Sequence, residues 1–267
     1  MSKRDRRRRR RSSIDDEIPL GPSAASRDRQ VRVLYVAVEG AATEPDYLIH
    51  LNHTFGDGGD RGDGRRPFQI HPISDRNGLL PKQAVAKAAE KAREGEEAWV
   101  LFDKDGADRD GDIREALAAA SDVQVDVCLS HPSFDLWLLL HFQPFSGAQS
   151  GSSRHVVDKL RAARGAEAFK DYDKRNDKSI KGRRRDALRG REAAAVANAR
   201  ALVNACEHGG CKAGKAQTGQ VDRRPSGEPT AKRGRWAART GHAPECDPVK
   251  RDPSTDVWRL LVSLGIV

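Results

Sequence analysis

Four short apolar runs, separated by segments with helical spacing, restrict most strongly how this chain can fold. The runs are residues 31–38, 68–73, 98–102 and 123–129. The first is almost continuously apolar and rich in β-branched residues, which is typical of a strand buried on both faces. A helix is predicted to begin at Thr43, which we expect to be its N-cap. Further helical patterns cover residues 81–93 and 113–120, and a nearly all-apolar helix is predicted over 132–142. Strands that alternate with helices predict an α/β fold with a doubly wound, mostly parallel sheet.

The composition changes on both sides of this segment, which predicts three regions. Residues 1–30 combine Arg, Ser, Asp and Pro without a period, and we expect a disordered basic tail. Residues 31–145 form the α/β domain, and residues 146–267 form an appended helical, basic C-terminal region. Within that region we expect a Gly/Ser linker, helices over 155–168 and 192–206, an irregular segment over 207–251, and a final amphipathic helix. The apolar face of this last helix predicts that it packs back on the body.

The net charge of +9 suggests a polyanionic partner, but most of that charge lies at the N-terminus. Residues 1–11 contain eight Lys or Arg and one Asp, a balance of +7, so the remaining chain carries about +2. Such a tail binds nucleic acid weakly and in a salt-dependent way. A purely solubilising terminus is the alternative. The charge alone therefore does not make the folded part a nucleic-acid binder.

Other broad classes are excluded by simple counts. No run approaches the roughly 18 apolar residues that a membrane span needs, and the basic start is followed by polar residues rather than by the apolar core of a signal peptide. Four irregularly spaced cysteines do not form a disulfide framework. We expect a cytoplasmic protein with no membrane partner.

Three carboxylates follow predicted buried strands. Glu39 comes directly after the first strand, and Asp103 and Asp105 come at the end of the third. In an open α/β sheet, sites form outside the carboxyl ends of strands where the connections diverge. Converging carboxylates repel one another unless a cation lies between them, and Mg²⁺ (or Mn²⁺) is the usual cation in phosphate chemistry. One carboxylate with a raised pKa could serve as general acid or base. Ordinary turns at Glu39-Gly40 and Asp105-Gly106 are the alternative.

The combination of a strand ending in Glu-Gly and a later apolar strand ending in Asp-x-Asp resembles the Toprim domain of topoisomerases, primases and related nucleases. A more extensive resemblance is to the RloB family, in three blocks: VEGAATEPDY at 38–47, SHPSFDLWLLLHF at 130–142 and PSTDVWRLL at 253–261. The Toprim resemblance implies that Glu39 acts as general acid/base and that Asp103 and Asp105 hold Mg²⁺. The RloB resemblance implies a role in bacterial restriction and anti-phage defence and a co-encoded ATPase as partner. This chain has His131 and Asp135 where the RloB family usually has Asn and Glu.

Asp135 is the second catalytic candidate. It is the only charged residue between Pro132 and Leu140, in the first turn of an apolar helix, where the helix dipole favours a carboxylate. A buried charge needs a partner or a metal, whereas a solvent-facing charge needs neither. Glu44, His131 and His141 are candidates to contact and orient the catalytic or metal-binding side chains without touching the metal or substrate themselves. The simpler interpretation is that Glu44 is an ordinary helix-start glutamate and that the two histidines are structural.

Residues 170–191 are a further candidate binding element, because they contain ten Lys or Arg and four Asp. Contacts to nucleic-acid phosphates, with Arg183, Arg184 and Arg185 at their centre, would account for this charge, and so would plain exposure to solvent. Cys206, Cys211, His242 and Cys246 could bind zinc, with His208 as an alternative ligand. Their spacing constrains this option only weakly, since thirty residues separate Cys211 from His242.

These features predict a Mg²⁺-dependent phosphodiester-cleaving nuclease that acts on DNA or RNA, with tRNA among the candidate substrates. The main alternative is a non-catalytic adaptor or effector of the same fold that binds an ATPase or nucleic acid without cutting it. Nucleotidyl transfer, as in primases, is a third option.

Overall fold

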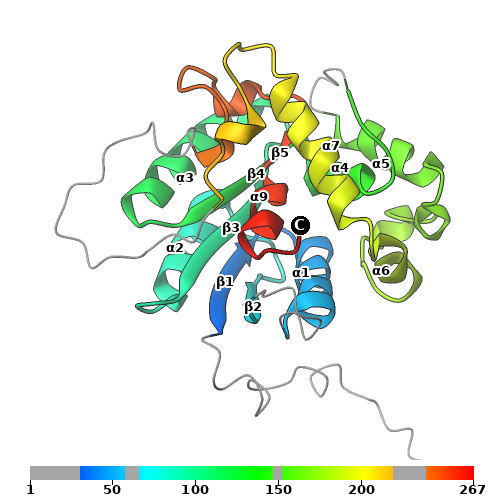
Figure 1. Ribbon diagram of the computed structural model, residues 1–267, viewed down its shortest axis with the longest axis horizontal. Coiled ribbons are helices and arrows are strands. Elements are labelled where there is room, and N and C mark those ends of the chain that lie inside the picture. Colours follow the sequence, from blue (N-terminus) through cyan, green and yellow to red (C-terminus); the bar gives the residue numbers. More distant parts are fainter. Residues whose placement is uncertain (1–30, 58–65, 147–151, 219–238) are drawn as a thin grey trace, which may run out of the picture.

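A five-stranded sheet with the order β2-β1-β3-β4-β5 organises the computed structural model (Figure 1). The structure describes residues 31–57, 66–146, 152–218 and 239–267. The predicted disordered tail of residues 1–30 and most of the predicted Gly/Ser linker lie outside these ranges. The strands are β1 (Arg32–Val38), β2 (Phe68–Ile73), β3 (Glu97–Asp103), β4 (Asp126–His131) and the short β5 (Ser254–Thr255).

The first four strands are parallel, and only β5 runs antiparallel to its neighbour β4. The strands are connected by α1 (Thr43–Phe55), α2 (Pro81–Lys91) and α3 (Asp110–Asp122), the last preceded by the 3₁₀ turn η3 (Ala107–Arg109). The chain moves from β1 to β2 on one side and then returns to place β3 on the other side of β1. The predicted doubly wound, mostly parallel α/β fold is confirmed, and its topological switch point lies between β1 and β3.

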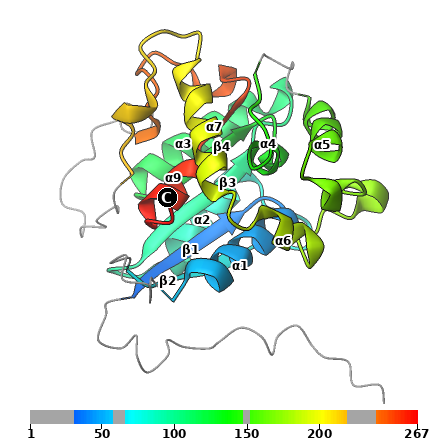
Figure 2. The ribbon, with the colours of Figure 1, turned by 45° about the vertical axis from the view of Figure 1, so that its right-hand side comes forward.

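Helices cover both faces of the sheet (Figures 1 and 2). Leu34, Val36 and Val38 of β1 face a core shared with α1, α4 (Phe134–Leu140), α7 (Glu192–Asn204) and α9 (Val257–Ser263). Ala37, between them in sequence, faces a second core shared with α2 and α3. The alternation of side chains along a strand explains why every position in the middle of β1 must be apolar.

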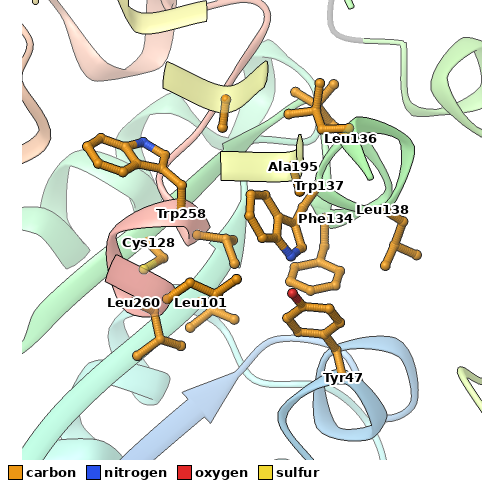
Figure 3. Packing of buried hydrophobic residues seen from close by; sticks show 14 of the residues in the cluster. Tyr47, Leu101, Cys128, Phe134, Leu136, Trp137, Leu138, Ala195, Trp258 and Leu260 are labelled. Atoms are coloured by element: carbon orange, nitrogen blue, oxygen red, sulfur yellow. The ribbon is translucent and has the colours of Figure 1, made fainter. Parts of the chain in front are cut away.

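An aromatic group joins α1 to α4 in the first core (Figure 3). The ring of Tyr47 lies 5.5 Å from that of Phe134 and 6.2 Å from that of Trp137, both edge to face. This packing fixes the first turn of α4 relative to the first turn of α1. Both turns carry acidic residues, Glu44 and Asp135, that are buried as well.

The C-terminal segment returns to the sheet, where α9 contacts β4 and α7. The guanidinium of Arg259 is fully buried, donates to Asp126 across 2.7 Å, and also donates to the carbonyl of Val127 across 2.9 Å. Arg239 donates to the other oxygen of Asp126 across 2.7 Å. One buried carboxylate therefore connects the start of β4 with two cations from the end of the chain.

Two local predictions were wrong. Thr43 was expected to cap α1, but Ala42 occupies the cap position, and the Thr43 hydroxyl donates instead to the carbonyl of Lys178 across 2.9 Å. The helix expected over 155–168 is α5 (Ser153–Ala162) followed by the 3₁₀ turn η4 (Glu167–Phe169). Gly165, between them, has a φ of +81°, which cannot continue a right-handed helix.

The remaining elements are short. The 3₁₀ turn η5 (Lys174–Asn176) and α6 (Arg183–Leu188) lie in the basic segment, and η6 (Ala213–Lys215) and η7 (Pro248–Lys250) lie in the segment predicted to be irregular. Within the described ranges, none of the helices combines the length and apolar content needed to cross a bilayer.

Candidate functional site

Glu39 and Asp103 meet at the switch point of the sheet. Glu39 follows β1 and Asp103 is the last residue of β3, so parallel pairing of these two strands places both at the same sheet edge. The backbone N–H of Asp103 donates to Oε2 of Glu39 across 3.2 Å. Glu39 and Asp103, which were predicted from the sequence to form the site, therefore lie at the carboxyl ends of the strands, where a doubly wound sheet has its binding crevice.

Four carboxylates gather here: Glu39, Glu44, Asp103 and Asp105, which we call the acidic cluster. Burial raises the pKa of Asp103 well above its usual range, and the nearby charges of Glu44, Asp105 and Glu39 raise it further. The backbone N–H of Phe134, at the start of α4, donates to Asp103 and partly opposes this effect. The cluster thus disfavours the ionised form of Asp103 unless a cation offsets its charge.

Glu44 enters the acidic cluster from the first turn of α1. Burial raises its pKa to about 7, and the charges of Asp135 and Glu39 contribute in the same direction. A Cβ at position 40 would collide with the Glu44 carboxylate, so the glycine at Gly40 is what lets this side chain approach the backbone. From the sequence, Glu44 was predicted to contact the site residues rather than the metal or substrate. In the structure it lies beside Asp103 and Glu39.

Arg109 is a functional candidate that sequence reasoning missed. Its guanidinium pairs with Oε1 of Glu39 across 2.5 Å. It lies in η3, after the Asp-x-Asp segment, in a run of alternating charges that offers no periodic signal. Asp105 also has a partner, because the hydroxyl of Ser153 donates to its Oδ1 across 2.7 Å. Each of the four carboxylates thus accepts at least one hydrogen bond from the protein itself.

Asp135 lies next to the acidic cluster and is almost completely buried, with 2% of its surface exposed. The Tyr172 hydroxyl donates to its Oδ1 across 2.5 Å, and Lys178 pairs with its Oδ2 across 3.0 Å. Ser133 donates to the same Oδ2 across 3.2 Å. The solvent-facing interpretation of Asp135 is therefore wrong. Tyr172 and Lys178, 37 and 43 residues further along the chain, were not identified from the sequence.

The basic segment contributes to the site through its first half. Lys178 reaches Asp135, and the backbone N–H of Ile180 donates to Asp46 in the first turn of α1 across 2.9 Å. Of the three predicted phosphate-contacting arginines, Arg183 is exposed and Arg185 is half-buried. Arg184 pairs with Asp177 across 3.1 Å and lies 5.4 Å from the ring centre of Tyr172. Arg184 therefore braces the segment that carries Tyr172 and Lys178.

The two candidate histidines lie in different surroundings. His131 ends β4, and burial lowers its pKa, an effect that the charge of Asp252 opposes. His141 is buried in the aromatic group between α1 and α4, where one ring nitrogen lies 2.9 Å from the Trp137 carbonyl and the other 3.3 Å from the Tyr47 hydroxyl. Burial lowers the pKa of His141 to about 4, so it is a neutral core side chain at pH 7.

Oxygen donors and mutual repulsion make the acidic cluster chemically suited to a hard divalent cation. Among the described residues, however, the set of ligating side chains whose atoms are already grouped closely enough to hold one ion is Cys206, Cys211, His242 and Cys246. That set could bind a metal. In the acidic cluster, a cation would bind beside the ion pair of Glu39 with Arg109 and the hydrogen bond from Ser153 to Asp105, or would displace them.

The fold and the site together define an α/β protein with carboxylates gathered at the switch point of a parallel sheet. The family model described as RloB-like protein matches residues 34–264, and the chain belongs to this family. This match supports the family resemblance seen in the three sequence blocks. Neither the curated proteins nor the solved structures contain a match to this chain.

Proposed function

We propose that this protein is a Mg²⁺- or Mn²⁺-dependent enzyme that cleaves phosphodiester bonds in nucleic acid at a Toprim-type site. The observation that carries the proposal is the convergence of Glu39, Glu44 and Asp105 on Asp103, whose pKa they raise. Such a concentration of carboxylates disfavours the folded state unless a cation or a proton relieves it. An acidic cluster at the switch point of an α/β sheet, in which Glu44 is buried and Glu39 and Asp103 are half-buried, is thus better explained by ligand binding than by stability.

The residues divide into donors for the metal and groups that act on the substrate. Asp103 and Asp105 would hold the divalent cation, which when bound polarises the scissile phosphate and offsets the charge that develops on it. Glu39, which directly follows β1 beside Asp103, would take or give the proton at the attacking or leaving oxygen, the role that the Toprim resemblance implies for it.

Cations around the cluster would position the substrate. Arg109 pairs with Glu39, and Lys178 pairs with Asp135, so two cations from separate segments of the chain reach this site. A substrate phosphate at this site can accept hydrogen bonds from both side chains. The guanidinium can donate two parallel hydrogen bonds to the same phosphate. Arg183, exposed on α6, and the basic tail would add contacts to more distant phosphates.

Family membership is the basis for two further parts of the proposal. We place the activity in anti-phage defence, and we expect a co-encoded ATPase as a partner. The substrate is DNA or RNA, including tRNA.

The alternative is an adaptor that binds nucleic acid or the ATPase without cutting, and one observation favours it. Glu39 is held in an ion pair with Arg109, and a general acid/base that remains paired in this way cannot exchange a proton easily. If the ion pair between Glu39 and Arg109 persists with substrate bound, the acidic cluster contributes charge to binding and does not catalyse cleavage.

Incubation of the purified protein with tRNA, plasmid and single-stranded DNA, with Mg²⁺ or Mn²⁺ and with EDTA, separates these options. We expect at least one substrate to be cut, and we expect cutting to disappear in EDTA and in Glu39→Gln. Glu90→Gln, an exposed glutamate on α2, is the matched control and should cut normally. Binding that survives EDTA, with no cutting by the wild-type protein, would support the adaptor instead.

A further inference from the structure

Three cysteines and one histidine form a compact cluster far along the chain from the acidic cluster. The ligand atoms of Cys206, Cys211, His242 and Cys246 all lie within 4.8 Å of one another. Cys206 follows the end of α7, and His242 and Cys246 lie in the segment that leads to η7 and β5. Nothing in the proposed phosphodiester chemistry uses these side chains.

The distances inside this cluster match a tetrahedral metal centre rather than a disulfide. The sulfurs of Cys206 and Cys246 are 3.7 Å apart, and Nδ1 of His242 is 3.5 Å from the Cys246 sulfur. Metal–sulfur bonds of about 2.3 Å and metal–nitrogen bonds of about 2.0 Å at tetrahedral angles place two sulfurs roughly 3.8 Å apart and a sulfur and a nitrogen roughly 3.5 Å apart. A disulfide needs about 2.05 Å between sulfurs, and all four cysteines are free.

Hydrogen-bond donors surround the cysteine sulfurs of this cluster, and such donors stabilise thiolate ligands. The backbone N–H of Ala243 donates to the Cys211 sulfur across 3.3 Å, and Nε of Arg251 donates to the Cys246 sulfur across 3.3 Å. Both sulfurs are buried, and so is the guanidinium of Arg251. Three thiolates and one neutral imidazole around a divalent ion leave one net negative charge, which the arginine offsets.

His208 is outside this set. It is exposed, and its Nδ1 lies 3.2 Å from the Cys206 sulfur, so it can hydrogen-bond to that ligand from the solvent side. Cys206, Cys211, His242 and Cys246 therefore supply the four ligands of a tetrahedral coordination sphere without His208.

We propose that Cys206, Cys211, His242 and Cys246 bind one zinc ion as a structural site. Sulfur and imidazole donors select zinc over Mg²⁺, and four protein ligands leave no open position for a substrate. The ion ties the end of α7 to the segment before β5 and α9. It thereby fixes the return of the chain to β4, where the sheet receives its antiparallel edge strand.

Elemental analysis of the full-length protein, purified without chelators, tests this directly. We expect about one zinc ion per chain, and we expect Cys211→Ser and His242→Ala to lose it. Cys128→Ser is the matched control, because Cys128 is a buried cysteine outside the cluster and should leave the zinc content unchanged.

A second measurement avoids variants that fail to fold. Zinc is removed from the wild-type protein with a thiol-directed mercurial, which is then quenched, and melting is followed before and after ZnCl₂ or CoCl₂ is added. We expect the melting temperature to fall on removal and to recover with ZnCl₂, and Co²⁺ to give the absorption of a tetrahedral thiolate complex. Protein that contains no zinc as purified and neither melts higher with ZnCl₂ nor gives the cobalt spectrum would overturn the proposal. Zinc retained in full by both ligand variants would overturn it as well.

Discussion

The backbone N–H of Asp103 donates to the side chain of Glu39 across 3.2 Å, so the end of β3 is hydrogen-bonded to the residue that follows β1. This bond crosses the switch point of the sheet. It orients the Glu39 carboxylate toward Asp103, and Arg109 holds the other oxygen of the same carboxylate. The proposed proton-transfer group and the proposed metal ligand are therefore parts of one structural unit.

Asp103→Asn and Asp105→Asn should each abolish metal-dependent cleavage and leave the protein folded. Burial and neighbouring carboxylates already raise the pKa of Asp103, so an uncharged amide there relieves repulsion and can raise the melting temperature slightly in EDTA. Cleavage assays and thermal melting measure the two effects. Asp108→Asn, in the same loop but outside the acidic cluster, is the control and should behave as wild type. Full activity in both site variants would exclude Asp103 and Asp105 as metal ligands.

Asp135→Ala should reduce both activity and stability. Its carboxylate accepts from the buried Tyr172 hydroxyl across 2.5 Å and pairs with Lys178, so removal leaves Tyr172 with the more distant Thr43 hydroxyl, at 3.2 Å, and Lys178 with solvent. We expect a loss of about 1–3 kcal/mol in the free energy of unfolding, because unpaired buried polar groups cost that much. Urea denaturation measures it, and Asp171→Ala, which removes an exposed carboxylate from the same segment, should cost much less.

Asp135→Glu should be tolerated, because the RloB family usually carries Glu at this position. The variant keeps the charge that Lys178 and Tyr172 require. A loss of stability as large as that of Asp135→Ala would contradict this prediction.

Stability should depend on pH through Glu44. Its pKa rises from 4.5 to about 7 on folding, so the folded protein holds a proton that the unfolded chain releases between these values. Stability contributed by this group is therefore complete below about pH 4.5 and decreases as the pH rises toward 7. In EDTA, Glu44→Gln should exceed wild type by on the order of 3 kcal/mol at pH 8 and by much less at pH 5.

Denaturant midpoints at the two pH values check this difference, and Glu94→Gln, an exposed glutamate, should show no such pH dependence. If Mg²⁺ binds the acidic cluster, adding it at pH 8 should stabilise wild type. A constant gap between wild type and Glu44→Gln at all pH values would show that the proton on Glu44 is not linked to folding.

Asp126→Ala should be the most destabilising of these substitutions. It leaves the fully buried Arg259 and the largely buried Arg239 without their shared carboxylate. Removing one partner of a buried ion pair typically costs about 3–5 kcal/mol. Chemical denaturation measures this, and Asp122→Ala, at the exposed end of α3, should change stability very little. An equal effect of the two substitutions would mean that α9 does not depend on this ion group for its position on β4.

The sequence by itself determined the sheet and one edge of the site. A strand buried on both faces must be apolar along its whole length, so the runs that became β1 and β3 could be located, and the carboxylates that end them could be assigned to one edge. The amphipathic pattern of residues 257–264 likewise predicted a helix that packs on the body, although α9 also buries Trp258 and Arg259, which lie outside the predicted apolar face. Each of these inferences needs only the local periodicity of a strand or a helix.

Only the tertiary structure decided which side chains surround those carboxylates. Arg109 reaches Glu39 across 70 residues, Lys178 reaches Asp135 across 43, and Cys206 reaches Cys246 across 40. Contacts of this kind depend on how loops and short 3₁₀ turns pack, and charged or sulfur-containing residues in such segments follow no period that reveals their partners. The physical reason is that the partner of a polar side chain is chosen by proximity after folding, whereas the burial of an apolar run is required before any site can exist.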